Sequence, residues 1–511
     1  MTILSTDAPS GGPLVAHDRG VAAAFRQVLD THGFAGDAVL SALGIPIGAT
    51  QSHVRLDLPV YLKRLASPSP LHTLIKLFVL DQRVDEEAAR SAVTPLSIAD
   101  LSDLGLVETG ARGVRARVRL SAYDGLVLAH DRYDGEPSLG RDHVLNVNPT
   151  TVALANLTVR RRVGSALDVG TGCGALALVA ARHSERVIGI DTNPRALNFA
   201  AFNAALNGVD HVEWRLGSLF EPVAGNRFDL IVSNPPYVIS PESRYVFRDS
   251  GRRGDAICEE IVRCIPQYLA EGGFASILCN WAIGPAEEWS APLARWVEDR
   301  GCDSWLISRG IQDPLTYAAA WNRSSDRDSY DDALRRWTAY CDELGIASLG
   351  LGAVILRRRT GGPNWTRCDV LAESPADSCG QQIERIFAAQ DFLPAVTDDR
   401  ALLEQTFRVA ADHRIHQVLA PKDGTYVTER AEIALAGGFR FRGNVDAHTI
   451  RLLQRCDGSC RLAAIARELA QDGTLSPEQA ETATVSTVRG LLAWGFLIPA
   501  DTHAGPATNQ P

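Results

Sequence analysis

The sequence lacks any long apolar run. No stretch of its 511 residues approaches the roughly 18 consecutive apolar residues of a membrane-spanning helix, so we expect no transmembrane segment. Residues 1–20 are polar and lack a charged region followed by an apolar core, so we predict no secretion signal. Both absences predict a cytoplasmic protein without membrane contact.

Clustered cysteines are also lacking. The ten cysteines are scattered, and the closest pair, Cys456 and Cys460, has no partners at the spacing of a zinc site. We therefore predict no metal site. The thiols are interpreted as reduced and buried, as is usual in a cytoplasmic protein.

An excess of basic side chains is missing as well. The net charge of −10 argues against a broad nucleic-acid-binding surface, although it leaves room for a local basic patch. One segment, residues 243–254, carries four arginines: Arg244, Arg248, Arg252 and Arg253. These side chains could bind phosphates or acidic groups, or they could simply be solvated.

The length of the chain predicts two to four domains, and a hydrophobic fraction of 45% is sufficient for real cores. We expect a mostly helical, winged-helix-like domain over residues 1–120. A central α/β domain follows over 121–360. An α+β domain with a winged-helix-like end is expected over 361–500, before a disordered tail at 501–511.

A proline-stiffened corner is the most informative feature that is present. Asn234, Pro235, Pro236 and Tyr237 directly follow an apolar run, residues 228–233, which predicts a buried strand. Two prolines cannot extend a strand, because neither has a backbone donor and both fix φ near −65°. The chain therefore leaves the sheet at its carboxyl edge, where open α/β sheets bind ligands.

A glycine-rich loop lies upstream, between a predicted strand at 163–169 and a helix-prone segment at 175–181. Glycines let a backbone approach a ligand, and the start of a helix adds free N–H groups. The strand end and the loop contain Asp168, Gly170, Thr171, Gly172 and Gly174, and the loop backbone could therefore approach a ligand.

A second strand, residues 186–190, ends at Asp191, whose carboxylate can accept both hydroxyls of a ribose. Thr192 or Asn193 then caps a helix that has Pro194 in its first turn. The glycine loop alone also fits the dinucleotide fingerprint of nicotinamide or flavin enzymes. The loop, Asp191 and the proline corner, in this order, favour a different chemistry.

From about residue 145 to 359 the chain resembles class I S-adenosylmethionine-dependent methyltransferases of the "methyltransferase small" type. The likeness extends to release-factor glutamine methyltransferases and to amino-group methyltransferases of RNA and DNA bases. The matching residues are 168–174, Asp191 and 234–237. The resemblance implies a seven-stranded Rossmann-like sheet with S-adenosylmethionine as cofactor.

In the family that the chain resembles, the glycine loop cradles the methionine part of the cofactor and the acidic residue holds the ribose. The proline corner binds the nitrogen that receives the methyl, with Asn234 also close to the cofactor. One departure is Ser218, which stands where the family usually has an aspartate near the adenine amino group. The hydroxyl of Ser218 can still form a hydrogen bond there.

The chemistry explains why these residue types suit an amino group. An amide or base nitrogen is a poor nucleophile, because its lone pair is delocalised. The side-chain oxygen of Asn234 and the carbonyl of Pro235 can each accept one N–H, and Tyr237 can stack on the planar group. The protein mainly supplies positioning and hydrogen bonds to the transition state. No general base is strictly required, because the methylated product nitrogen is acidic and releases its own proton.

These observations predict an enzyme that methylates a planar nitrogen of a macromolecule. The acceptor is a nucleobase amino group of RNA or DNA, or a glutamine side chain of a protein such as a release factor, and the motif does not separate them. Two alternatives are a dinucleotide-dependent oxidoreductase and a catalytically silent binding scaffold.

Overall fold

The computed structural model describes residues 13–16, 18–46, 57–132, 140–323, 327–371, 373–375, 377–396 and 398–500. The tail predicted at 501–511 lies outside these ranges. Contacts divide the chain into two compact units. The first comprises Met1–Ala155 and Arg161–Ala372, and the second comprises Asn156–Arg160 and Glu373–Pro511.

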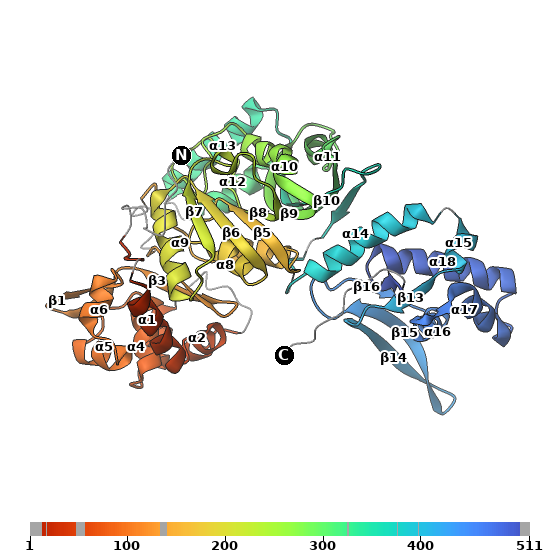
Figure 1. The fold of residues 1–511 in the computed structure, drawn as a ribbon, viewed down its shortest axis with the longest axis horizontal. Helices are drawn as coiled ribbons and strands as arrows, with labels where there is room; N and C mark the ends of the chain where they lie inside the picture. Colours follow the sequence, from red (N-terminus) through yellow and green to blue (C-terminus); the bar gives the residue numbers. More distant parts are fainter. Residues whose placement is uncertain are drawn as a thin grey trace. The chain divides into compact units, whose positions relative to one another are not determined.

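The first unit is built on a mixed sheet of eight strands in the order β12-β10-β11-β9-β8-β5-β6-β7 (Figure 1). The strands are β5 (Val163–Val169), β6 (Ser184–Asp191), β7 (Val212–Leu216), β8 (Phe228–Ser233), β9 (Leu269–Ile283), β10 (Cys302–Gln312), β11 (Ser348–Arg358) and β12 (Thr366–Val370). Strands β5 to β9 run parallel, and β11 is antiparallel to both β9 and β10. This is the α/β sheet that the sequence predicts, with one strand more than expected.

The additional strand corrects a predicted boundary. Thr366–Val370 (β12) lies beyond residue 360, where we expected the central domain to end, yet it pairs in parallel with Ser304–Ser308 of β10. The glycines and proline at 361–363 are therefore a connection inside the first unit. The boundary between the units falls near residue 372.

Helices cover both faces of the sheet. Helices α8 (Ala175–Ala181) and α9 (Pro194–Leu206) lie on one face, while α10 (Ala256–Tyr268) and α11 (Ala291–Val297) lie on the other (Figure 1). Strands enclosed in this way are rich in apolar residues, as β8 is in its sequence FDLIVS. Two further helices, α12 (Pro314–Asn322) and α13 (Arg327–Glu343), are inserted between β10 and β11.

The part of the chain before the sheet is mostly helical, as predicted. Its elements are α1 (Arg19–Thr31), α2 (Gly36–Leu43), α3 (Leu58–Arg64), α4 (Pro70–Phe78), α5 (Glu86–Val93), α6 (Ile98–Asp103), β1 (Val107–Gly110), β2 (Gly113–Ala116), β3 (Arg119–Tyr123), β4 (Leu126–His130) and α7 (Pro149–Asn156). A bridge joins Val84 to Val114 of β2. With the bridge at Val84 taken as a first short strand, the helices and strands from α4 to β2 follow one another in the order of a winged helix.

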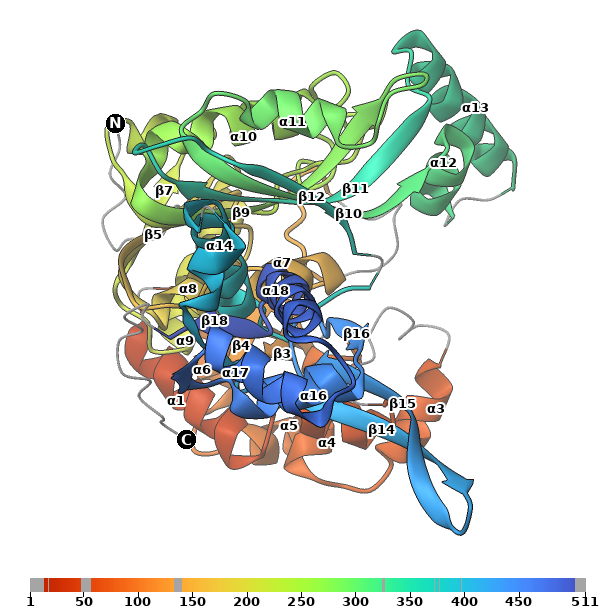
Figure 2. The same ribbon diagram turned by 90° about the vertical axis from the view of Figure 1, so that its right-hand side faces the viewer.

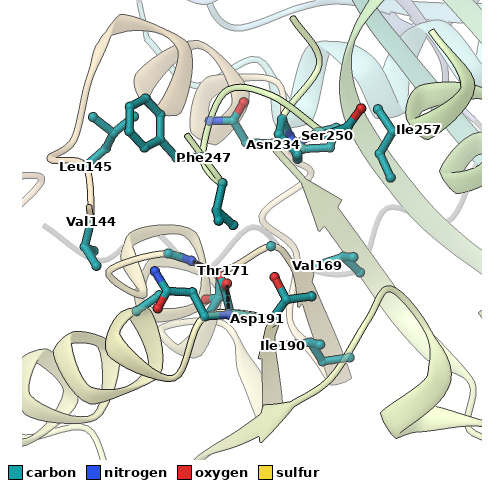
Figure 3. A pocket seen from close by; sticks show the side chains of 18 of the residues that line it. Val144, Leu145, Val169, Thr171, Ile190, Asp191, Asn234, Phe247, Ser250 and Ile257 are labelled. Carbon is teal, nitrogen blue, oxygen red and sulfur yellow. Dashed lines mark hydrogen bonds between the residues drawn. The ribbon is translucent and has the colours of Figure 1, made fainter. Parts of the chain in front are cut away.

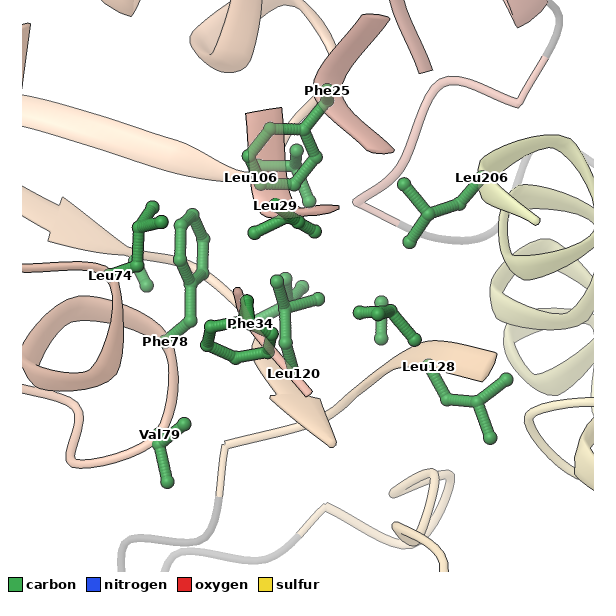
Figure 4. Packing of buried hydrophobic residues seen from close by; sticks show 14 of the residues in the cluster. Phe25, Leu29, Phe34, Leu74, Phe78, Val79, Leu106, Leu120, Leu128 and Leu206 are labelled. Carbon is green, nitrogen blue, oxygen red and sulfur yellow. The ribbon is translucent and has the colours of Figure 1, made fainter. Parts of the chain in front are cut away.

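This helical part shares its core with α9, one of the helices that cover the sheet. Phe25, Phe78 and Leu128 belong to the same buried cluster as Leu206 at the end of α9 (Figure 4). The region expected as a separate domain over residues 1–120 is thus packed within the first unit.

The second unit combines helices and two three-stranded sheets, in agreement with the predicted α+β class. Its elements are α14 (Gly380–Ala395), α15 (Asp399–Leu403), β13 (Thr406–Val409), β14 (His413–Lys422), β15 (Thr425–Leu435), β16 (Arg442–Asn444), α16 (Ala447–Arg455), β17 (Asp457–Arg461), α17 (Leu462–Leu469), α18 (Pro477–Ala493) and β18 (Leu497–Pro499). Figure 2 shows β14 and β15 as a long hairpin. The order from α16 to β18 is winged-helix-like.

The described residues contain neither a candidate membrane span nor a candidate metal cluster. None of their helices has both the length and the apolar character needed to cross a bilayer. Among the same residues, no group of three His, Cys, Asp or Glu side chains is placed to hold a metal ion.

All ten cysteines are free, but Cys264 and Cys460 are only half-buried and Cys368 is exposed. The prediction that all the thiols are buried is therefore wrong for these three.

Candidate functional site

A cavity of about 400 Å³ opens at the carboxyl ends of β5, β6 and β8 (Figure 3). Eight of the predicted site residues line it: Gly170, Thr171, Gly172, Asp191, Ser218, Asn234, Pro235 and Pro236. The glycine loop, the acidic residue and the proline corner therefore face one another across a single space. Asp168, Gly174 and Tyr237 are not part of the lining that the described residues form.

The glycine loop follows β5 and needs glycine for two different reasons. Gly170, Gly172 and Gly174 have φ values of 78°, 55° and 86°, a region that L side chains rarely adopt. A Cβ added to Gly172 would meet no atom within 4 Å, because it would point into open space. At Gly174 it would lie 3.0 Å from Ala200 and from Trp214, so this glycine serves packing.

Asp168 holds the loop from inside the protein. Its side chain is fully buried, and its Oδ2 accepts hydrogen bonds from Thr171 Oγ1 (2.7 Å) and from the backbone N–H of Ala177 (3.0 Å). Its Oδ1 is buried with no hydrogen-bond partner among the described atoms. Burial raises the pKa of Asp168 to about 7.

Asp191 links the loop to the next helix. Its Oδ2 accepts from the N–H of Gly172 and its Oδ1 from the N–H of Asn193, each at 2.9 Å. Burial raises the pKa of Asp191, and these backbone donors oppose that rise. Asn193 caps α9 by accepting from the N–H of Arg195 at 3.0 Å, and Pro194 follows in the first turn, as predicted.

The proline corner begins where β8 ends. Ser233 anchors it, since its hydroxyl donates to the carbonyl of Val169 at 2.9 Å. Within the corner the N–H of Tyr237 donates to the carbonyl of Pro235 at 2.8 Å. Tyr237 is only 8% exposed, and its phenol interacts with the side chain of Thr150 at the start of α7. Burial raises the pKa of this phenol.

The four arginines after the corner have partners inside the protein. Arg248 pairs with Asp249 (2.9 Å) and Glu242 (3.1 Å). Arg253 pairs with Glu343 at 2.9 Å, Arg252 forms an ion pair with Glu260, and the guanidinium of Arg244 lies 4.9 Å from the ring centre of Tyr245. Among the described residues, each arginine of this loop therefore has a carboxylate or aromatic partner.

One wall of the cavity was not predicted. Residues 141–148, here called the wall segment, precede the sheet, and Val144 and Leu145 from this segment line the cavity near Phe247 (Figure 3). The sequence gives no glycine pattern or charged motif at this segment. Its one recognisable signal is Asn148 before Pro149, which marks the start of a helix.

The comparisons with known proteins agree with the resemblance. Residues 146–288 match the methyltransferase small domain, while residues 31–117 and 384–499 match two domains of unknown function (DUF7059 and DUF7782). A release factor glutamine methyltransferase of Xylella fastidiosa is 37% identical over 131 residues, covering 23% of this chain and 48% of the relative. A ribosomal protein uL3 glutamine methyltransferase of Bradyrhizobium diazoefficiens is also 37% identical over 131 residues, covering 23% and 40%.

The chain thus spans less than half the length of these two curated relatives. A solved ribosomal protein L11 methylase of Lactobacillus delbrueckii is similar over 48% of this chain and all of its own length, with 17% identity and a TM-score of 0.26. The glycine loop, Asp191 and the proline corner all lie within the matched segment. The central part of this chain is therefore a methyltransferase small domain, distantly homologous to the release factor glutamine methyltransferases and of a family that uses S-adenosylmethionine.

Proposed function

We propose that this protein transfers a methyl group from S-adenosylmethionine to the side-chain amide of a glutamine in another protein. The observation that carries the proposal is the shared cavity, in which Gly172 and Asp191 face Asn234 and Pro235. A volume of about 400 Å³ is within the usual range for a small-molecule site.

The lining residues suit the cofactor. Asp191 would hold the ribose, because each carboxylate oxygen keeps a lone pair after accepting one backbone N–H. Gly170 and Gly172 would let the loop approach the methionine part, and Ser218 would face the adenine. The cofactor supplies a methyl group that is activated by a positively charged sulfur.

The proline corner suits the acceptor. The side-chain oxygen of Asn234 would accept one N–H of the amide, and the carbonyl of Pro235 would accept the other. That carbonyl already accepts from the N–H of Tyr237, which leaves its second lone pair for the acceptor. Holding both N–H groups orients the nitrogen lone pair toward the methyl group, so the main contribution is positioning.

Several features favour a protein acceptor over a nucleobase. The loop arginines form internal pairs, for example Arg248 with Asp249, and the net charge of the chain is −10. A nucleobase inside a helix would also have to be flipped out, at a cost of a few kcal/mol. The two curated relatives described above are glutamine methyltransferases of proteins.

Calorimetry with S-adenosylhomocysteine and NAD tests the cofactor. We expect the wild-type chain to bind the first ligand and not the second. The reverse result would establish the alternative of a dinucleotide-dependent oxidoreductase and overturn the proposal.

Substitution of Asn234 tests the acceptor site. We expect Asn234→Ala to reduce transfer of labelled methyl to a protein extract by roughly a hundredfold or more, because a positioning hydrogen bond is lost. Its affinity for S-adenosylhomocysteine should stay within a few-fold of wild type. Asn226→Ala, just before the same strand β8, is the control and should retain activity. Unchanged activity of Asn234→Ala would mean that this amide does not hold the acceptor.

A further inference from the structure

The wall segment, residues 141–148, closes the cavity from outside the sheet. Arg141, His143, Val144 and Leu145 all line the cavity, although none belongs to an element of the sheet or to the helices that cover it. Val144 is 2% exposed and His143 is 8% exposed, so the middle of the segment is packed in place. Its position therefore depends on the groups that hold it.

Asp131 is the first of these groups. It directly follows β4 and is 8% exposed. Its Oδ2 accepts from the N–H of Val144 at 2.9 Å, and its own N–H donates to the carbonyl of Val144 at 3.1 Å. Asp131 thus makes two hydrogen bonds to one residue of the wall segment.

The same carboxylate is bound by the first turn of α9. Arg195 Nε donates to Oδ2 of Asp131 at 3.0 Å, and its terminal nitrogen forms an ion pair with Oδ1. The pairing is bidentate, the strongest geometry for such a pair. Asn193 adds a third tie, since its Nδ2 donates to the carbonyl of Asp142 at 2.8 Å.

The other edge of the wall segment meets the loop that follows the proline corner. The N–H of Val246 donates to the carbonyl of Arg141 at 3.1 Å. The rings of His143 and Phe247 lie 5.9 Å apart. The segment therefore connects the end of β4, the start of α9 and the loop over the acceptor side of the cavity.

We propose that Asp131, through its bidentate pair with Arg195, positions the wall segment and thereby sets the affinity of the cavity for the cofactor. Asp131 does not line the cavity, so it is a positioning residue and acts through Val144. This inference rests on the proposed function only in that the cavity binds S-adenosylmethionine.

Calorimetric titration with S-adenosylhomocysteine tests the proposal. Relative to wild type, we expect Asp131→Ala to weaken binding roughly tenfold to a hundredfold, because a buried charged hydrogen bond is lost. Asp131→Asn keeps the size of the side chain and one acceptor oxygen, so its affinity should lie between those of wild type and Asp131→Ala. It provides the same test if the alanine variant does not fold. With methyl transfer as a second readout, KM for S-adenosylmethionine should rise while kcat at saturation stays within about twofold, as expected for lost uniform binding.

A matched control separates positioning from stability. Asp303 is also buried and pairs with two arginines, Arg357 and Arg359, but it does not line the cavity or contact the wall segment through the described hydrogen bonds. Asp303→Asn should lower the melting temperature without changing the affinity for S-adenosylhomocysteine. If Asp131→Asn and Asp131→Ala bind the ligand as tightly as wild type, the positioning role is refuted. If the wild-type chain does not bind S-adenosylhomocysteine, the proposed function is contradicted before the role of Asp131 is tested.

Discussion

The side-chain amide of Asn203 forms hydrogen bonds with both the N–H and the carbonyl of Ala129. Its Oδ1 accepts from the N–H of Ala129 at 2.7 Å, and its Nδ2 donates to the carbonyl of Ala129 at 2.9 Å. The same Nδ2 donates to the carbonyl of Cys173, in the glycine loop, at 2.8 Å. One buried amide therefore ties the N-terminal part of the chain to the loop of the candidate site.

The same arrangement occurs twice more, at Asn198 within α9 and at Asn207, which caps the C-terminus of this helix. Asn207 makes the same two hydrogen bonds to Val127, at 3.0 and 2.7 Å, and Asn198 makes them to Leu14, at 3.2 and 2.8 Å. Each amide replaces the partner that a neighbouring strand would provide. The N-terminal part is thus held in register against the helix that also carries Arg195.

Removing the amide of Asn203 should cost stability. We expect Asn203→Ala to lower the free energy of unfolding by roughly 2–4 kcal/mol, because it leaves polar groups of Ala129 and Cys173 buried without partners. Asn207→Ala is the matched comparison. Asn207 is half-buried, so water can replace its bonds and the loss should be smaller. Urea unfolding measures both, and equal losses would contradict this account.

Two glycines of the loop should separate binding from packing. Gly172→Ala and Gly174→Ala share the cost of a positive φ, of order 1 kcal/mol. Gly172 lines the cavity, and its new methyl would meet no protein atom within 4 Å. This variant should therefore lose affinity for S-adenosylhomocysteine with little further loss of stability. At Gly174 the new methyl meets Ala200 and Trp214, which should cost roughly 1–3 kcal/mol more. Thermal unfolding measures the stability of both variants, and calorimetry measures their affinity. If Gly172→Ala lost more stability and Gly174→Ala lost more affinity, these roles of the two glycines would be refuted.

Asp168 should make the stability of the ligand-free protein depend on pH. Burial raises its pKa to about 7, well above the value of about 3.9 in an unfolded chain. The folded state therefore binds a proton that the unfolded state releases, so this contribution is present below about pH 4 and is lost as the pH rises to about 7. In Asp168→Asn this part of the pH dependence should disappear. Denaturant unfolding of both proteins from pH 4 to 8 measures it, and parallel curves would contradict the raised pKa.

Glu242 should hold the loop over the acceptor side of the cavity. It contacts Arg248 (3.1 Å), Arg336 (3.0 Å) and the indole nitrogen of Trp337 (3.3 Å). We expect Glu242→Ala to lower kcat for methyl transfer roughly tenfold, since positioning of the acceptor is lost, while the affinity for S-adenosylhomocysteine changes little. Glu343→Ala removes only an exposed pair with Arg253 and is the control. An equal effect of both variants would show that the contacts of Glu242 do not matter for the reaction.

The predicted parts of the site were those with local sequence signals. Asp168, Asp191 and Asn234 each stand at the end of a strand that is recognisable from its apolar run, and parallel strands bring their carboxyl ends to one edge. Tyr237 shows the limit of this reasoning. Its place in the motif did not reveal that Tyr237 is buried and lies outside the cavity lining.

The wall segment could not be predicted, because its contacts join residues that are distant in sequence. Asp131 and Arg195 are 64 positions apart, and no sequence motif around either residue predicts their ion pair. The asparagines of α9 left a weaker signal, since they interrupt a helix that is otherwise rich in alanine and phenylalanine. The boundary at residue 360 was misplaced because a short glycine–proline turn has the same composition as a linker between domains.

The most direct test is the identity of the methyl acceptor. The purified chain is incubated with methyl-labelled S-adenosylmethionine and a cell extract, and the labelled material is separated into protein, RNA, DNA and small molecules. We predict that the label enters protein and is recovered after digestion as glutamine methylated on its side-chain nitrogen, and that Asn234→Ala abolishes it. Label found in RNA, in DNA or only in small molecules would contradict the proposed function.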